Sequence, residues 1–455
     1  MLKLKERLRT PSMHPKLVLA FLAVLLPAFC ASNKQVTFHK DVVPVLQKRC
    51  QECHRPGEAA PMSLLTYQDS RPWAKAIKAA VLAKKMPPWF ADPAHGKFSN
   101  DRRLTQEEID VLAGWADGGA KEGNKKDAPP ALTFADGWTI GKPDVVFEMP
   151  QPFTVPAKGT VDYTWIVVPT NFTEDKWVEK IEVRPGARDV VHHIVLIARA
   201  PGNGFMSKAK PGVPFTPTPG KPARGEDKGR GIFYMLGGGV EMVSVYVPGG
   251  LAYETLPGQA RLIKAGTDLV FQMHYTANGK ETPDQSRVGI VFAKEPPKER
   301  VVNTFIANPL LRIPPEDGNA PVVAKVTIQD DVTLQSMFPH MHVRGKSMEY
   351  RATYPDGRSE VLLNVPKYDF NWQLSYCLKK PKKLPKGTQL EITAHYDNSA
   401  NNPANPDPKQ EVRWGEQTWE EMLAAFVDFA IPVDMNPLDI GRPKQQSKPA
   451  TTGGN

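Results

Sequence analysis

Short apolar runs separated by proline- and glycine-rich turns fill most of this chain from Phe134 onward, and they constrain its fold more than any other feature. The runs include Val145–Phe147, Tyr163–Val168, Trp177–Val183 and Val190–Ile197. Runs of this length, bounded by turn residues, are typical of antiparallel strands. The 45 prolines and 34 glycines, spread along 455 residues, also favour turn-rich β structure over helical bundles. A chain of this length predicts roughly two to four domains.

The run Phe338–Val343 carries two histidines, His340 and His342. On a strand they project from the same face, because side chains alternate, and together they make half of a metal site. A lone His-x-His is more often a surface or hydrogen-bonded pair. The metal interpretation gains weight from other histidines in the β region, which are His192, His193, His274 and His395.

The chain contains the same order of features twice: a close pair of histidines, then a Gly-Thr turn, then an apolar run that ends in a histidine. Lys264–Thr267 precedes a run that ends at His274, and Lys386–Thr388 precedes a run that ends at His395. Each run follows a close pair of histidines. The repetition predicts a duplicated β domain with a metal site in each copy. We expect the copies to span residues 134–298 and 299–436, followed by a disordered tail over residues 437–455.

The first predicted ligand set is His192, His193 and His274. Adjacent histidines on an ideal strand point to opposite faces, so a bulge or a strand end is needed to bring both rings to one metal. In the second set, His340 and His342 need a third ligand, for which His395 and Met422 are the candidates. Imidazole suits zinc, copper and iron, whereas a thioether selects soft metals and especially Cu(I). Three histidines with an open position also match a catalytic zinc site, so a zinc hydrolase stays an alternative.

The N-terminus predicts an exported protein. Basic residues precede an apolar run over Leu17–Leu26, which small residues follow, so residues 1–31 read as a signal peptide. Cys30 raises a lipoprotein alternative, which the bulky Phe29 before it makes weaker. Removal of residues 1–31 lowers the formal charge from +9 to about +5. We therefore expect a periplasmic or secreted bacterial protein with no transmembrane segment and no nucleic-acid partner.

Cys50, Cys53 and His54 form a Cys-x-x-Cys-His motif, the attachment pattern of a c-type haem. The alternatives are half of a zinc site and a thioredoxin-like redox pair, but there is no second cysteine pair for zinc. A short amphipathic helix over Val42–Arg49 leads into the motif. A second helix begins near Thr105, where Glu108 completes a capping box. Residues 35–120 resemble the class I cytochrome c domains of exported bacterial proteins, and residues 121–133 form a polar linker.

His54 is the predicted axial ligand on one side of the haem iron. The candidates for the other side are Met62, Met86 and His95. Lys85–Trp89 resembles the distal methionine loop of these cytochromes, so we expect Met86 to be the ligand. Methionine and histidine together raise the reduction potential and suit electron transfer.

Residues 134–433 resemble the copper type II, ascorbate-dependent monooxygenases, the family of peptidylglycine hydroxylating monooxygenase and dopamine β-monooxygenase. The resemblance rests on four motifs in the family's order, which are Val191–Ile194, Gln272–Tyr275, His340–His342 and Glu420–Met422. It implies two jelly-roll-like β-sandwich domains that face each other across an open cleft. It further implies that His192, His193 and His274 hold an electron-storing copper. By the same resemblance His340, His342 and Met422 hold the copper that binds dioxygen.

The chain departs from that family where peptide-amidating members read their substrate. Those positions carry Phe338, Ala424 and Phe426, so a small or apolar substrate is expected in place of a peptide. His395 occupies a position where the familiar members have no ligand, and we expect it to support the copper site without direct ligation. Cys377 is alone, so no disulfide framework holds these domains together.

These observations predict an exported copper monooxygenase that hydroxylates a C–H bond with dioxygen. Its cofactors would be two copper ions and one haem c, and an external donor would reduce the haem. Tethering the haem to the copper domains raises its effective concentration there. The alternative is a non-catalytic exported electron-transfer or copper-handling protein.

Overall fold

The computed structural model describes residues 35–58, 60–134, 137–216, 239–250 and 252–441. The predicted signal peptide and Cys30 lie outside the described residues. Within the described ranges, no helix is long and apolar enough to cross a membrane.

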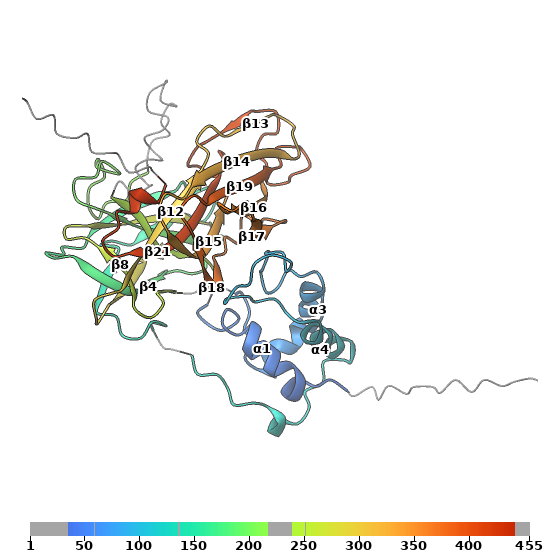
Figure 1. The fold of residues 1–455 in the computed structure, drawn as a ribbon. Helices are drawn as coiled ribbons and strands as arrows, with labels where there is room; N and C mark the ends of the chain where they lie inside the picture. Colours follow the sequence, from blue (N-terminus) through green and yellow to red (C-terminus); the bar gives the residue numbers. More distant parts are fainter. Residues whose placement is uncertain (1–34, 59, 135–136, 217–238, 251, 442–455) are drawn as a thin grey trace, which may run out of the picture. The chain divides into compact units, whose positions relative to one another are not determined.

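The α-helices lie in the N-terminal part of the described chain and group together with two short helical turns (Figure 1). They are a π-helical turn η1 (Phe38–Val42), α1 (Val43–Arg49), α2 (Tyr67–Ser70), the short 3-10 helix η2 (Arg71–Trp73), α3 (Ala74–Leu82) and α4 (Gln106–Asp117). The predicted capping box begins α4: the Glu108 N–H donates to the Thr105 hydroxyl, and the Thr105 N–H donates to the Glu108 carboxylate. The face of α4 with Ile109, Leu112 and Trp115 packs into the core of this helical part.

Most of the chain forms β-sheets, as the sequence predicts. The largest sheet has nine strands in the order β1-β11-β4-β8-β12-β21-β15-β18, with β7 paired to β4. Their bounds are β1 Val145–Glu148, β4 Lys176–Arg184, β7 Tyr253–Glu254, β8 Gln259–Ile263, β11 Arg287–Phe292, β12 Glu299–Ala307, β15 Val332–His340, β18 Tyr376–Leu384 and β21 Ala424–Pro432. The first half of the β region therefore supplies one side of this sheet and the second half the other. The two sides join where β8 pairs with β12 in parallel.

Each half also has a four-stranded sheet of its own. The first has the order β3-β9-β5-β6 and the second the order β14-β19-β16-β17. The strands are β3 Thr164–Pro169, β5 Val191–Arg199, β6 Val240–Tyr246, β9 Asp268–Tyr275, β14 Ala320–Thr327, β16 Gly345–Thr353, β17 Ser359–Val365 and β19 Gln389–Tyr396. Two-stranded sheets add β2 (Phe153–Val155) to β10 (Thr282–Asp284), and β13 (Arg312–Ile313) to β20 (Val412–Arg413).

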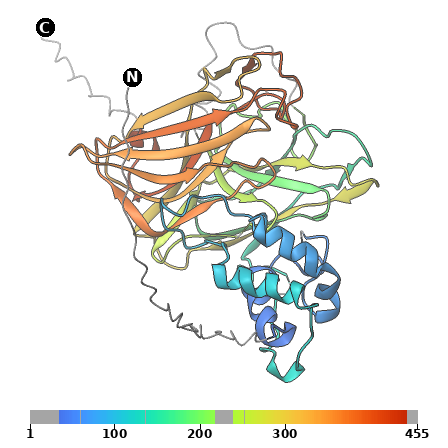
Figure 2. The same cartoon turned by 90° about the vertical axis from the view of Figure 1, so that its right-hand side faces the viewer.

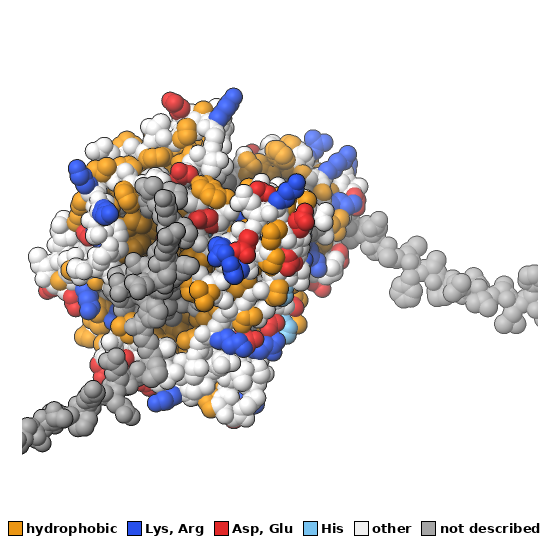
Figure 3. Space-filling view, turned by 90° about the horizontal axis from the view of Figure 1, so that it is seen from above, with side chains coloured by type: hydrophobic (Ala, Val, Ile, Leu, Met, Phe, Trp, Pro, Cys, Tyr) orange, Lys and Arg blue, Asp and Glu red, His pale blue; other side chains and the backbone are white. Residues whose placement is uncertain are grey.

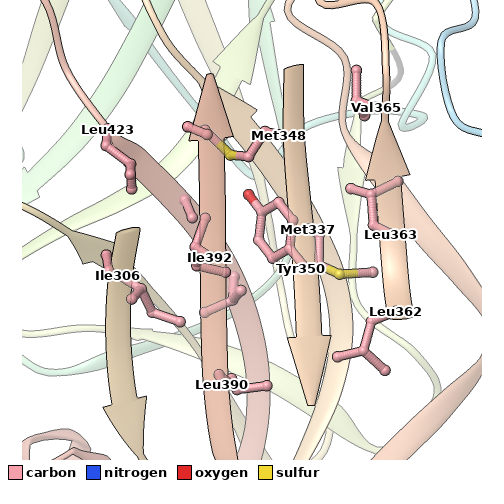
Figure 4. Close-up of a cluster of buried hydrophobic side chains, with 14 of the residues drawn as sticks. Ile306, Met337, Met348, Tyr350, Leu362, Leu363, Val365, Leu390, Ile392 and Leu423 are labelled. Carbon is pink, nitrogen blue, oxygen red and sulfur yellow. The ribbon is translucent and has the colours of Figure 1, made fainter. Parts of the chain in front are cut away.

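The cores show that each half is a sandwich. In the second half, Met337 of the large sheet packs in one cluster with Tyr350 and Ile392 of the four-stranded sheet. Figure 4 shows these side chains pointing toward one another between the strands. In the first half, Ile181 of the large sheet shares a cluster with Phe271 of the facing sheet. Figure 2 shows the strands of the second half, orange to red, from a second direction.

The duplication predicted from the sequence has a counterpart in the strand order. β9 lies between β3 and β5, and β19 lies between β14 and β16. Each of these central strands follows a glycine with positive φ, Gly266 at 68° and Gly387 at 89°. Glycine tolerates this conformation because it has no Cβ. The two four-stranded sheets thus repeat the same arrangement.

The start of the predicted C-terminal tail is ordered, which corrects its boundary. Residues Pro437–Ile440 form the 3-10 helix η4, capped by the Asn436 side chain. Ile440 is buried, and its carbonyl accepts a hydrogen bond from the Gln329 N–H. One apolar side chain therefore secures this segment to the second sandwich. The predicted linker also contains a short 3-10 helix, η3 (Lys125–Asp127).

Candidate metal centres

Three histidines of the first half converge. His192 and His193 lie on β5, and His274 lies on β9, opposite His193. The strand register shifts between Val191 and His193, which is the irregularity that adjacent histidines need to reach one centre. One ring nitrogen of each histidine lies within 4.8 Å of the others.

The nitrogens of this triad face one another. Nδ1 of His193 lies 3.2 Å from Nδ1 of His192 and 3.4 Å from Nδ1 of His274. Burial lowers the pKa of all three imidazoles, that of His274 to about 3, and neighbouring histidines lower the pKa of His193 and His274 further. Neutral imidazole is the form that ligates metals. The set therefore suits a cation that takes up the converging lone pairs.

The second pair is positioned by hydrogen bonds that fix its tautomers. His340 ends β15, and its Nδ1 lies 2.6 Å from Oε1 of Gln373, which can only accept. Nδ1 of His342 lies 3.1 Å from the carbonyl oxygen of Glu420, so it also donates. Both rings thus keep Nε2 as the nitrogen with a lone pair. Nε2 of His342 is buried and has no hydrogen-bond partner among the described residues.

These two imidazoles are also held neutral. Their ring centroids lie 5.2 Å apart, with the ring planes at 84°. Burial lowers the pKa of His340, and burial together with His340 lowers that of His342 to about 3. A ring whose second nitrogen donates to a carbonyl is typical of metal-ligating histidine.

Met422 is tied to this pair through Glu421. The buried Glu421 carboxylate accepts from the backbone N–H groups of His342, at 2.9 Å, and Arg344, at 2.6 Å. In the pairing of β15 with β21, His340 lies opposite Ala424, two residues after Met422. Met422 packs beside Phe338 and Phe426, and its carbonyl accepts from the Tyr396 hydroxyl. The sequence places these residues far apart, and the strand pairing brings them to one end of the sheet.

Phe370 lies between the two histidine sets. Its ring stacks on His192 with centroids 5.7 Å apart and planes at 20°, and its centroid lies 6.1 Å from that of His274 and 6.4 Å from that of His342. The resemblance predicts an open cleft between the two sets, whereas here one aromatic side chain contacts both. Phe370 belongs to the loop after β17, which also carries Gln373.

His395 pairs with a residue shortly after the second histidine pair, and its supporting role at that pair stays a prediction. It faces Ser347 across β19 and β16, and its Nδ1 lies 3.2 Å from the Ser347 hydroxyl. The corresponding pair in the first half is His274 opposite His193, and in both pairs the register shifts beside the residue opposite the histidine. Serine stands where the first half has a histidine. The second half therefore lacks the counterpart of the first triad at this position.

The Cys-x-x-Cys-His motif follows α1 directly. Cys50 caps the C-terminus of α1, and the His54 N–H donates to the Cys50 carbonyl. Both thiols are free, and burial raises the pKa of Cys50 to about 12 and raises that of Cys53. Nδ1 of His54 lies 3.3 Å from the Met62 carbonyl, so its Nε2 remains for a ligand.

The three candidates for the opposite axial position lie in different segments. Met62 is half-buried against the helical core, and Met86 is half-buried after α3. His95 lies in a turn in which its N–H donates to the Asp92 carbonyl. The choice of Met86 remains a prediction.

Sequence reasoning missed the residues that hold the ligands in place. Gln373, Phe370 and Glu421 are such residues, and only Glu421 had a sequence signal, its position beside Met422. Gln373 and Phe370 come from a loop without a motif, so only the tertiary fold places them. Tyr163 was missed in the same way, although its ring centroid lies 4.7 Å from that of His274.

No protein-family model matches the chain. No curated protein matches it either. Similar solved structures include infectious bursal disease virus strain Gx, 8% identical over 65% of this chain and 74% of that chain, with a TM-score of 0.18. The Macrobrachium rosenbergii nodavirus is 8% identical over 68% of this chain and 96% of that chain, with a TM-score of 0.15. Likeness at these TM-scores carries no argument about this chain.

Proposed function

We propose that this protein is an exported copper-dependent monooxygenase that hydroxylates a C–H bond of a small or apolar substrate, with electrons supplied through an attached c-type haem. The observation that carries the proposal is the triad His192, His193 and His274, whose ring nitrogens converge within 4.8 Å. The second pair, with its donating Nδ1 atoms and the buried Nε2 of His342, supports a second site.

The donor types favour copper over zinc. The first set offers imidazole alone. The second offers imidazole with the Met422 thioether, which lies in the segment just before the paired strand β21 and packs against Phe338 and Phe426. Copper stands above zinc in the divalent affinity order, and a thioether favours Cu(I). We infer that His192, His193 and His274 would hold one copper, and that His340, His342 and Met422 would hold the other.

Copper at the second site would supply activation of dioxygen, so that one oxygen atom enters a C–H bond and the other leaves as water with two electrons and two protons. The chain's own residues prepare the site for that chemistry. Gln373 and the Glu420 carbonyl orient the two rings, and Glu421 holds the backbone at His342 and just after it. Phe338 and Phe426 exclude water beside His340, because their centroids lie 6.4 Å and 6.2 Å from its ring.

We further infer that residues 35–120 form a class I cytochrome c domain and that the two sandwiches are jelly-roll-like. Cys50 and Cys53 would anchor the haem by thioether bonds, and His54 and Met86 would be the axial ligands. The Nδ1 contact of His54 with a backbone carbonyl supports the role of its Nε2. On the face shown in Figure 3, basic and acidic side chains are interspersed.

Metal and haem analysis of the mature protein, matured with copper and zinc both present, tests this proposal. The expected result is two coppers and one covalently bound haem for each chain. Zinc without copper would overturn the copper assignment. Copper together with dioxygen consumption, but with no hydroxylated product from any candidate substrate, would instead support the electron-transfer alternative.

A further inference from the structure

A cavity of about 530 Å³ lies along the outer face of the large sheet, on the side away from the core of the second sandwich. Strands β12, β21 and β15 pair in register here and present three successive rows of side chains. Asn303, Asp428 and Ser336 form a polar row; Phe305, Phe426 and Phe338 form an aromatic row; Ala307, Ala424 and His340 form the row at the second histidine pair.

The three rows follow one another along β15 from the polar row to His340, so one end of the cavity is polar and the other is apolar. Ser336, Phe338 and His340 alternate with core residues such as Met337, so all three project from the same face of β15. The polar row lies four residues from His340, which corresponds to ~13 Å along the strand. Each bond of ~1.5 Å in an extended alkyl chain advances the zigzag by ~1.25 Å, so octan-1-ol spans about 10 Å and reaches from the polar row past the aromatic row toward His340.

The polar end is electrically balanced. The charged residues that line the cavity are two cations and two anions, Arg102, Glu254, Arg261 and Asp428. Asp428 is fully engaged, because it accepts from Arg261, Asn303 and Ser336. A ligand carboxylate would add an uncompensated charge to this site, and burying such a charge is costly.

One donor at this end is unused. Arg261 is 1% exposed, and its Nε is buried without a hydrogen-bond partner among the described residues. Its other nitrogens contact Glu241 and Asp428, and its guanidinium lies 4.4 Å from the centroid of the Tyr253 ring. A buried donor of this kind suits one neutral oxygen acceptor.

We propose that this cavity binds uncharged, chain-like molecules with a single alcohol or carbonyl oxygen, which rests in the polar row. The apolar chain lies along the aromatic row, of which Phe338 and Phe426 line the cavity, and its far end, remote from the oxygen, points toward His340 in the next row. This assignment of substrate class rests on the proposed monooxygenase function. It makes the reactive C–H bond the one at the apolar end.

Calorimetric titration of the full-length protein, both copper-free and copper-loaded, with octan-1-ol and with octanoate tests the inference without catalysis. Octan-1-ol should bind at least tenfold more tightly than octanoate at neutral pH. Met242→Trp fills the cavity and should weaken octan-1-ol binding at least tenfold. Met435→Trp, at a half-buried methionine outside the cavity lining, should leave binding unchanged.

Asp428→Asn removes one negative charge while keeping a hydrogen-bond acceptor. The ratio of the affinity for octan-1-ol to the affinity for octanoate should therefore fall about tenfold. Equal or tighter binding of octanoate by the natural protein would overturn the ligand class, as would no binding of octan-1-ol. Unchanged binding of octan-1-ol by Met242→Trp would show that the ligand does not bind in this cavity. If Met242→Trp does not fold, Phe426→Trp replaces it in this test. Failure of the copper proposal shows separately, as an absence of copper from a protein that still binds octan-1-ol.

Discussion

At the scale of single residues, hydrogen bonds fix the tautomers of His340 and His342 and leave only Nε2 of each ring for a metal. Nδ1 of each ring already donates, to Gln373 or to the Glu420 carbonyl. Nε2 of His342 is buried, and no described residue hydrogen-bonds it, which costs free energy unless a metal ion or a hydrogen-bond donor binds its lone pair. Each residue of this pair should therefore have a distinct and measurable effect on metal content.

His342→Ala should remove the copper of the second site and leave that of the first. The reason is that two ligands from His340 and Met422 do not complete a site. His395→Ala is the matched control, because His395 lies in the same half and hydrogen-bonds Ser347. Copper content by mass spectrometry should fall by about half in the first variant and stay constant in the second. Equal copper content in both variants would show that His342 is not a ligand of the second copper.

Met422→Ile should abolish sulfur ligation at the second site while haem attachment persists, since isoleucine fills space but offers no thioether. X-ray absorption of the reduced protein should lose its copper–sulfur contribution, at roughly 2.3 Å by analogy with other metal–sulfur bonds. Met341→Leu is the control, because Met341 is a fully buried core residue between the two histidines. A copper–sulfur signal that survives Met422→Ile would exclude this residue as ligand.

At the scale of elements, the sequence predicts local structure well and the joining of elements poorly. The capping box of α4, the β character of the chain and the repeated central strands with their glycines are all present in the fold. These features depend on neighbouring residues, so a local pattern contains them. The parallel pairing of β8 with β12, by contrast, depends on tertiary packing that no local pattern carries.

The candidate sites divide in the same way. The first triad was predictable, because duplicated strand ends placed His274 opposite the His192–His193 pair. The same argument gives no second histidine triad at His395, because the residue across from it is Ser347. Phe370 and Gln373 were not predictable, since an irregular loop presents them.

Glu421 connects the segment before β21, which contains Met422, to the segment that contains His342 and Arg344. Glu421→Gln replaces one acceptor oxygen by an NH2 group, so one of the N–H groups of His342 and Arg344 loses its partner. We expect a loss of about 1–3 kcal/mol in the free energy of unfolding, measured with urea. Glu411→Gln, at an exposed carboxylate, should change it by less than about 0.5 kcal/mol. An equal change in the free energy of unfolding for both substitutions would contradict a stabilising role for the hydrogen bonds that Glu421 accepts.

At the scale of the whole molecule, buried titratable groups couple folding to pH in opposite directions. Burial lowers the pKa of His192, His193, His274, His340 and His342. An unfolded histidine titrates near 6.5, so below that pH the unfolded chain binds more protons and is favoured. Burial raises the pKa of Glu421 to about 8, so this carboxyl favours the folded chain from about pH 8 down to its unfolded pKa of about 4.5.

Below pH 6.5 the histidines with a lowered pKa, which also include His54, outnumber the two buried carboxyls with a raised pKa, Glu416 and Glu421, so the metal-free protein should lose stability on acidification. The free energy of unfolding should fall by at least ~2 kcal/mol between pH 7 and pH 5, because one histidine with a pKa near 3 alone contributes about that much. Urea unfolding at a series of pH values measures this slope. His274→Gln should reduce the slope, because it removes a histidine whose pKa burial lowers to about 3. Stability that is constant or rises over this interval would show that the two histidine sets are not held neutral by burial.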